Sequence, residues 1–329
     1  MKKSALPSLL IVSLCLTLGL NACAPLIIGV QGFLNPTKTY AVFIPPAQTL
    51  PSPSNTVTPT ATLSPTSTPQ PSDTLAPSDV PTATVSPTTP PPTVTPTWIL
   101  NDPGRVVAPI LLYHHVASDG GDSRYYVDTE NFRQQMKALR RWGYTSITPS
   151  YLAQVLIHGG ELPARPVIIT FDDGNLDVYT NAFPIMRKMG FVGTVYIVAE
   201  RLGEYNLVNA EQLAEMAAAG WEVGSHTMSH ADLTYNHWQL SYELQQSRTL
   251  LEDTLGVPVL TLAYPYGLSD DYIVEWAKEY GYTAGMGLGT FNEHTLDTLF
   301  FLNRREVYFE YDINAFSALL PWTEPLTTP

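Results

Sequence analysis

The chain has 329 residues and a formal net charge of −13 at pH 7. Its few basic residues form no run that would follow a phosphate backbone, which excludes nucleic acid as a partner. From residue 101 onward there are 28 acidic and 14 basic residues, so the acidic excess belongs to the C-terminal part. The only two cysteines are Cys15 and Cys23, so that part needs no disulfide.

The first 23 residues are typical of an export signal. Lys2 and Lys3 precede an apolar run over residues 9–20, which is too short to span a bilayer and has the length of a signal-peptide core. The run ends in Leu-Asn-Ala-Cys, which resembles the lipobox of bacterial lipoproteins. The resemblance implies that Cys23 carries a lipid and holds the exported chain on the membrane, facing outward at the cell envelope. Because the asparagine is uncommon there, cleavage near Ala22 and secretion remain the alternative.

A proline-rich segment separates this signal from the rest. Residues 24–50 are mixed and receive no assignment. Residues 51–97 hold 13 prolines and 21 serines or threonines, with no glycine and two charged residues. Such a segment buries too little apolar surface to fold, so we expect a disordered, semi-rigid spacer. The folded domain is expected at residues 101–320, a comfortable size for one core.

Within this domain, strand patterns alternate with helix patterns. Buried-strand patterns occupy residues 106–113, 145–147, 167–171, 192–198, 221–223, 259–263, 282–286 and 300–307. Helix patterns begin at residues 128 or 129, 150, 178, 209, 237, 269 and 312. About seven such repeats with short loops predict a closed or nearly closed α/β barrel. A GxGxxG motif does not follow the first strand, so a dinucleotide-binding fold has no support.

Three polar clusters follow predicted strands, at residues 170–174, 225–230 and 263–267. In β/α barrels the catalytic groups lie at the C-terminal ends of the strands. Taken singly, each cluster has a structural explanation: a solvated turn, a surface histidine pair, or a proline turn. Their appearance at successive strand ends indicates a site.

The residue types in these clusters suit metal-assisted hydrolysis. His226 and His230, four apart in a predicted helical turn, share one face, and one carboxylate from a neighbouring strand completes a three-ligand site. Such a site keeps an open position for water, whose pKa the metal lowers. Asp172 and Asp173 are consecutive, so their side chains diverge. One can bind the metal while the other takes a proton from the water.

The motifs Thr-Phe-Asp-Asp-Gly at 170–174 and His-Thr-x-x-His at 226–230 resemble the polysaccharide deacetylases of the NodB-homology, carbohydrate esterase family 4 type. The resemblance covers about residues 105–310 and implies a distorted (β/α)7 barrel that hydrolyses N-acetyl groups on sugars. It implies Asp172 as the general base, and Asp173, His226 and His230 as ligands of a divalent metal, usually zinc. It also implies that the Tyr266 N–H, in a turn shaped by Pro265, stabilises the oxyanion.

The sequence departs from the family pattern at two places. Ala263 stands where the third motif often has an arginine that orients the base, and Arg304 is the candidate replacement. The usual later Leu-x-His, which supplies the general acid, is absent. The opening Leu-Tyr-His-His-Val at 112–116 is similar to a subgroup that acts on poly-N-acetylglucosamine. That similarity implies that His114 protonates the leaving amine, with residues 111–113 expected to point into the barrel and His115 the weaker candidate.

These observations together predict an exported, lipid-anchored, zinc-dependent deacetylase of an N-acetylglucosamine-type cell-wall or extracellular polysaccharide. Two alternatives remain: a carbohydrate-binding lipoprotein without turnover, and a hydrolase of a non-sugar amide on the same fold. Two histidines and a carboxylate also suit non-haem iron enzymes, but the β/α alternation disfavours them. The other histidines, His158, His237 and His294, are expected on the surface.

Overall fold

The computed structural model describes residues 97–120, 123–235 and 237–326. The predicted signal at 1–23 with Cys23, the unassigned segment 24–50 and all but the last residue of the spacer lie outside the described residues. In the described ranges, none of the helices has the length and apolar character needed to cross a membrane.

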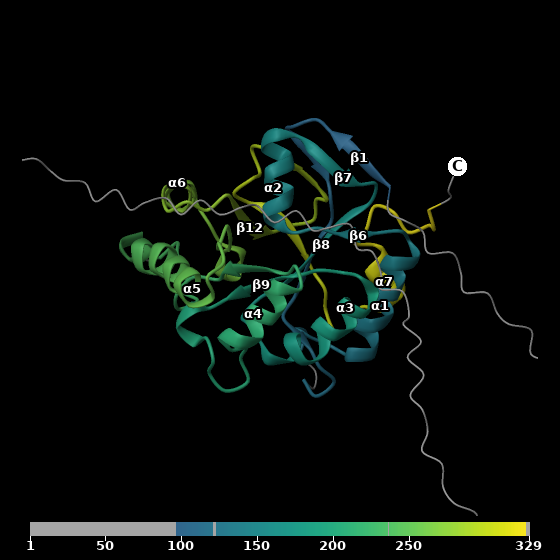
Figure 1. The fold of residues 1–329 in the computed structure, drawn as a ribbon, viewed down its shortest axis with the longest axis horizontal. Coiled ribbons are helices and arrows are strands. Elements are labelled where there is room, and N and C mark those ends of the chain that lie inside the picture. The colour runs from purple at the N-terminus through teal and green to yellow at the C-terminus, as the bar shows by residue number, and fades with distance from the viewer. Residues whose placement is uncertain (1–96, 121–122, 236, 327–329) are drawn as a thin grey trace, which may run out of the picture. The chain divides into compact units, whose positions relative to one another are not determined.

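Seven parallel strands form a closed barrel (Figure 1). In ring order they are β3 (Ile110–Tyr113), β14 (Leu302–Glu306), β12 (Ala284–Leu288), β11 (Thr261–Ala263), β10 (Glu222–Ser225), β9 (Thr194–Ile197) and β8 (Pro166–Phe171). The pairing of β8 with β3 closes the ring, and the short strand β6 (Thr145–Ser146) adds to the side of β8. The predicted (β/α)7 barrel is confirmed.

Helices follow most of the barrel strands (Figure 1). They are α1 (Thr129–Arg141), α2 (Pro149–His158), α3 (Phe183–Met189), α4 (Ala210–Ala218), α5 (Ser247–Leu255), α6 (Asp271–Glu279) and α7 (Ile313–Ser317). Asp128, Asn209 and Asp312 accept backbone N–H groups at the first turns of α1, α4 and α7. Their side chains therefore satisfy donors that a helix start leaves unpaired.

Two predicted helices are less regular than expected. The helix predicted from residue 178 starts as a π-helical turn, Val178–Ala182, because Pro184 has no N–H with which to continue an α-helical ladder. The helix predicted at 237–255 is broken into a 3-10 turn (His237–Gln239), a π-helical segment (Ser241–Gln246) and α5. There the Ser247 hydroxyl donates to the carbonyl of Glu243, a local bond that competes with the helix ladder.

The strand predicted at 106–113 is two strands. β2 (Arg105–Val107) pairs antiparallel with β13 (Glu293–Thr295), and β3 begins only after Pro109, which cannot donate to a ladder. His294 on β13 is fully buried, and its Nε2 donates to the Ala108 carbonyl at 3.0 Å. The prediction that His294 lies on the surface is therefore wrong: the unpredicted β2–β13 pair buries it.

Two further short pairs were also not predicted. β1 (Trp98–Asn101) runs antiparallel to β7 (Gly160–Pro163), and β4 (His115–Val116) runs parallel to β5 (Tyr126–Val127). With two to four residues each, these strands are too short to give a periodic signal.

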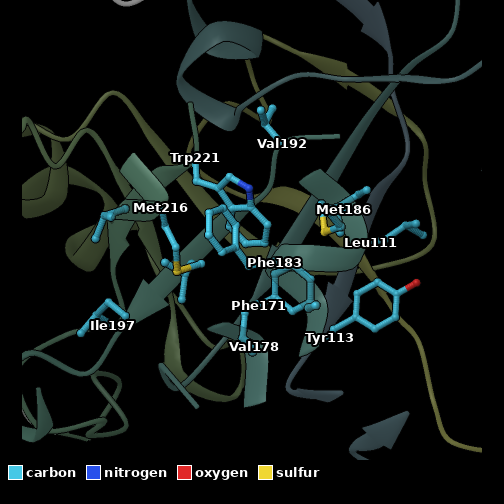
Figure 2. Close-up of a cluster of buried hydrophobic side chains, with 14 of the residues drawn as sticks. Leu111, Tyr113, Phe171, Val178, Phe183, Met186, Val192, Ile197, Met216 and Trp221 are labelled. Atoms are coloured by element: carbon cyan, nitrogen blue, oxygen red, sulfur yellow. The ribbon is translucent and has the colours of Figure 1, made fainter. Parts of the chain in front are cut away.

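Side chains alternate between two buried clusters. Ile110 belongs to the cluster that also contains Ile168, Tyr196 and Met286, whereas Leu111 and Tyr113 pack with Phe171 and Trp221 against the helices (Figure 2). The prediction that residues 111–113 all point into the barrel is wrong, because successive side chains of a strand face opposite sides.

The amino-terminal end of the barrel is closed by α2. Leu152 and Leu156 of this helix are fully buried in the same cluster as Ile110 and Ile168. The carboxyl-terminal end, where the polar clusters lie, is therefore the end available for a site.

Candidate active site

The carboxyl ends of four barrel strands bring the predicted residues together. Asp172 and Asp173 follow β8, His226 to His230 follow β10, and the Pro265–Gly267 turn follows β11. His114 follows β3, which is hydrogen-bonded to β8. Parallel strands place all these groups at one end of the barrel.

Three side chains converge as metal ligands would. The Asp173 Oδ1 lies 3.6 Å from the His226 Nε2 and 3.5 Å from the His230 Nε2. In a tetrahedral zinc site with bonds of about 2.0–2.2 Å, neighbouring ligand atoms are about 3.3–3.6 Å apart. The His226 Nδ1 donates to the Ala263 carbonyl at 2.8 Å, which leaves Nε2 with a free lone pair toward Asp173. The donor set and the two distances to Asp173 therefore fit a divalent metal ion, and all three ligand atoms lie within 4.8 Å of one another.

The two histidines lie on an irregular loop, not on the predicted helical turn. Thr227 and His230 both have a backbone φ of 65°, in the left-handed region that costs non-glycine residues free energy. Because of these backbone turns, the His226 and His230 rings meet edge to face, with centroids 4.8 Å apart. Asp173 also has a positive φ, 71°, so two of the three ligands depend on unusual backbone geometry.

Asp172 is a buried carboxylate paired with a buried arginine. The Arg304 Nη1 and Nη2 donate to its two oxygens at 2.6 and 2.8 Å. Burial by itself would raise the pKa of Asp172, but the charges of Arg304 and His226 lower it to about 2. Asp172 is therefore ionised at neutral pH, and its Oδ2 lies 3.7 Å from the His226 Nε2.

Arg304 extends into the barrel interior from β14. Its side chain is 1% exposed, and its Nε donates to the Gly287 carbonyl at 3.3 Å. The arginine that the third motif lacks at position 263 is thus matched by a guanidinium from a different strand, bound to the same carboxylate.

The two adjacent histidines after β3 have different surroundings. His114 is half-buried, its ring lies 4.7 Å from that of Tyr125, and burial lowers its pKa while Asp172 and Asp173 pull it upward. His115 is paired with Asp177 at 2.6 Å and stacks on Tyr126. Of these two histidines, His114 feels the charges of Asp172 and Asp173, whereas His115 is held by Asp177, so His114 is the one that the structure brings to the site.

Tyr266 forms one wall of this site. Its backbone φ is 58°, its side chain is 60% exposed, and its ring lies edge to face with His230 at 4.8 Å. Trp221 and Tyr264, which are also aromatic and near the polar clusters in sequence, are instead buried against the helices.

Comparisons with known proteins agree with this arrangement. The family model described as polysaccharide deacetylase matches residues 159–285. The Bacillus subtilis protein YxkH, named provisionally as a polysaccharide deacetylase, is 30% identical over 194 residues, which cover 58% of this chain and 68% of that protein. The chain belongs to the polysaccharide deacetylase family.

One further sequence relative and two solved structures are also similar to this chain. The poly-β-1,6-N-acetyl-D-glucosamine N-deacetylase of Staphylococcus aureus is 29% identical over 181 residues, or 50% of this chain and 61% of that enzyme. A crystal structure of a Bacillus cereus polysaccharide deacetylase superposes with a TM-score of 0.59 and 27% identity, covering 65% of this chain and 69% of that one. The structure of IcaB from Ammonifex degensii superposes with a TM-score of 0.56 and 25% identity, covering 66% of this chain and 97% of that one.

Glu243 supports the candidate site and was not predicted from the sequence. Glu243 is 1% exposed; its Oε2 accepts the N–H groups of Met228 and Ser229 at 3.0 and 2.9 Å, and its Oε1 accepts the Ser229 hydroxyl at 2.6 Å. These three bonds hold the loop between the two histidines. A signal was present: Glu243 lies in the apolar stripe of Leu240 and Leu244, where a carboxylate needs buried partners.

Proposed function

We propose that this chain hydrolyses N-acetyl groups on an N-acetylglucosamine-containing cell-wall or extracellular polysaccharide, releasing acetate and leaving a free amine on the sugar. The observation that carries the proposal is the buried, ionised Asp172 beside the Asp173, His226 and His230 cluster. The name of the staphylococcal relative supports the substrate class.

In this proposal, Asp173, His226 and His230 hold a divalent ion, with zinc favoured by the two imidazoles and one carboxylate. Such an ion supplies a Lewis acid and makes water more acidic. Asp172 then accepts the proton of the attacking water, and Arg304 keeps this carboxylate ionised and oriented. A carboxyl group with a pKa of about 2 is a weak base, so it depends on that increased acidity.

The remaining groups act on the amide. His114 protonates the leaving amine, and the Tyr266 N–H, in the turn that contains Pro265, donates to the oxyanion. The overall reaction consumes one water and converts an acetamide into acetate and an amine.

The missing motif arginine and the missing Leu-x-His are the two reasons to consider sugar binding without turnover. The structure weakens both, because Arg304 binds both oxygens of Asp172 and His114 interacts with Asp172 and Asp173. Burying an ion pair costs free energy of desolvation, and a module that only binds sugars has no use for it at this place.

The proposed location rests on the sequence. We propose that the chain is exported and held at the cell envelope by a lipid on Cys23, with residues 51–97 as a spacer. Incorporation of labelled fatty acid into the expressed protein, and its loss in Cys23→Ser, tests the anchor. Unlabelled wild-type protein would favour simple secretion instead.

Acetate release from N-acetylglucosamine oligomers tests the proposed reaction. The wild-type protein should release acetate, and Asp172→Asn should bind the same amount of metal with activity reduced at least about a hundredfold, because only the proton acceptor changes. His226→Ala should lose both metal and turnover. Full activity in Asp172→Asn would contradict the assigned role.

A further inference from the structure

A cavity adjoins the candidate active site. It has a volume of about 640 Å³ and is lined by the segments that follow β3, β8 and β9. These are three neighbouring strands of the barrel, so the cavity opens at the same end as the metal-ligand cluster. The reaction described above makes no use of it.

A single loop separates this cavity from the cluster. Asp173 belongs to the cluster, and Asn175 and Asp177, a few residues later, line the cavity. Two residues of chain span at most about 7 Å, so Asn175 lies close to the ligand. The Asn175 amide also donates to the His114 carbonyl at 3.1 Å, which ties the cavity wall to the segment of the candidate acid.

The lining has unused hydrogen-bonding capacity. The side chains of Thr180 and Asn206 line the cavity and make no hydrogen bond or ion pair within the described part of the chain. Asn206 is held at a φ of 61°, and its carbonyl accepts the Leu176 N–H at 2.9 Å. The backbone therefore fixes a free amide at the cavity edge.

An aromatic ring stands beside these polar groups. Tyr205 lines the cavity and is 92% exposed, so one face of its ring is free to stack. Hydroxyl, amide and carboxylate groups next to an aromatic ring are what a sugar ring requires, since it has hydroxyls at its edge and C–H groups on its faces. Anions fit less well, because the lining has two aspartates and one arginine, Arg201, which pairs with Glu204.

We propose that this cavity binds a neighbouring sugar unit of the polysaccharide while the reacting unit occupies the metal-ligand cluster. The inference rests on the proposed function, which makes an N-acetylglucosamine polymer the ligand. Its consequence is a preference for linked sugar units over a single sugar, because only linked units occupy both places at once.

The test compares the N-acetylglucosamine monomer and hexamer as substrates. Tyr205→Ala should lower kcat/KM for the hexamer about three- to tenfold and leave the monomer unchanged, and Tyr205→Phe should keep the wild-type values because it keeps the ring. Leu100→Ala, which removes an 81% exposed side chain from β1, is the control and should change neither substrate. Equal values of wild type and Tyr205→Ala on the hexamer would overturn the inference.

A binding measurement separates this inference from the proposed function. Calorimetric titration of the hexamer into Asp172→Asn needs no turnover, and adding Tyr205→Ala should weaken hexamer binding by a similar factor. Hexamer binding that depends on Tyr205, without acetate release by the wild type, would support the cavity and overturn the proposed function. Acetate release with hexamer binding indifferent to Tyr205 would support the function and overturn the cavity.

Discussion

A buried ion pair, between Asp172 and Arg304, lies at the carboxyl end of the barrel. Asp172 directly follows β8 and Arg304 lies on β14; these strands are not adjacent, and both side chains are almost fully removed from water. Each is costly to bury alone, so the pair is stable only because the two hydrogen bonds and opposite charges compensate. The sequence suggested Arg304 as a replacement for the missing motif arginine, and the barrel closure explains how it reaches Asp172.

Arg304→Gln should therefore be strongly destabilising. It leaves the Asp172 carboxylate buried without its cation, which we expect to lower the free energy of unfolding by about 3–5 kcal/mol, measured by urea titration at pH 7. Arg133→Gln, which removes an exposed arginine that pairs with Glu130, is the control and should change it by less than about 1 kcal/mol. An equal effect of the two substitutions would contradict the account of the pair.

Sequence motifs predicted the side chains of the site better than their backbone. The aspartates and histidines were found because their residue types and strand-end positions are local features. The positive φ values at Asp173, Thr227 and His230 were not predicted, because they depend on contacts with distant segments. Glu243 supplies such contacts from 14 and 15 residues away, and its place in an apolar stripe indicates that it is buried but not which loop it binds.

At the scale of elements, the loop between the two histidines depends on that glutamate. Glu243→Ala removes three hydrogen bonds from the loop, and we expect the dissociation constant for zinc to rise about 10–100-fold. Glu243→Gln keeps an oxygen for the two N–H groups and should recover most of the affinity. Zinc titration against a competing chelator measures both, with the exposed Glu275→Ala as the control. Wild-type affinity in Glu243→Ala would show that the loop holds its shape without this residue.

The pair of β2 and β13 makes stability depend on pH. His294 is buried there with its Nδ1 unpartnered, and burial lowers its pKa from 6.5 to about 4, the neighbouring Glu293 only partly opposing this. In the unfolded chain the His294 imidazole takes up a proton as the pH falls through 6.5, whereas in the folded chain it stays neutral until about pH 4. Stability is therefore full above pH 6.5 and decreases by roughly 3 kcal/mol toward pH 4.

His294→Gln should remove much of this acid sensitivity, since glutamine does not titrate and can still donate to the Ala108 carbonyl. Urea midpoints at pH 7 and pH 5 test the expectation. His158→Gln, in which the replaced histidine is exposed, should keep the wild-type pH dependence. An equal change of the urea midpoint between pH 7 and pH 5 in wild type and His294→Gln would refute the assignment of the acid sensitivity to His294.

Most barrel elements followed from apolar periodicity, because strands buried on both faces and helices with one apolar stripe give strong local signals. The exceptions are informative. Pro109 and Pro184 changed a strand and a helix through a single missing N–H each. The pairs β1–β7, β2–β13 and β4–β5 depend on contacts between segments far apart in the chain, which local patterns do not report.

At the scale of the whole described domain, the two ends of the barrel have separate tasks. The amino-terminal end is filled by apolar side chains of α2, and the candidate site occupies the other end. Such separation lets one end stabilise the fold without contacting the site.

Leu152→Ala at the α2 end should therefore affect stability alone. Removing this fully buried side chain should lower the free energy of unfolding by about 2–5 kcal/mol. Acetate release per folded molecule should remain at the wild-type value at a temperature where the variant is folded. A reduced kcat with unchanged unfolding would contradict the division between the two ends.

The central claim is that a metal held by Asp173, His226 and His230 permits Asp172 to act in N-acetyl hydrolysis. The most direct measurement titrates zinc into chelator-treated protein while both bound metal and acetate released from an N-acetylglucosamine hexamer are followed. The account predicts that acetate release is lost on chelation and returns in proportion to zinc up to one ion per chain. Full activity in the metal-free protein, or one bound zinc with no acetate released, would contradict it.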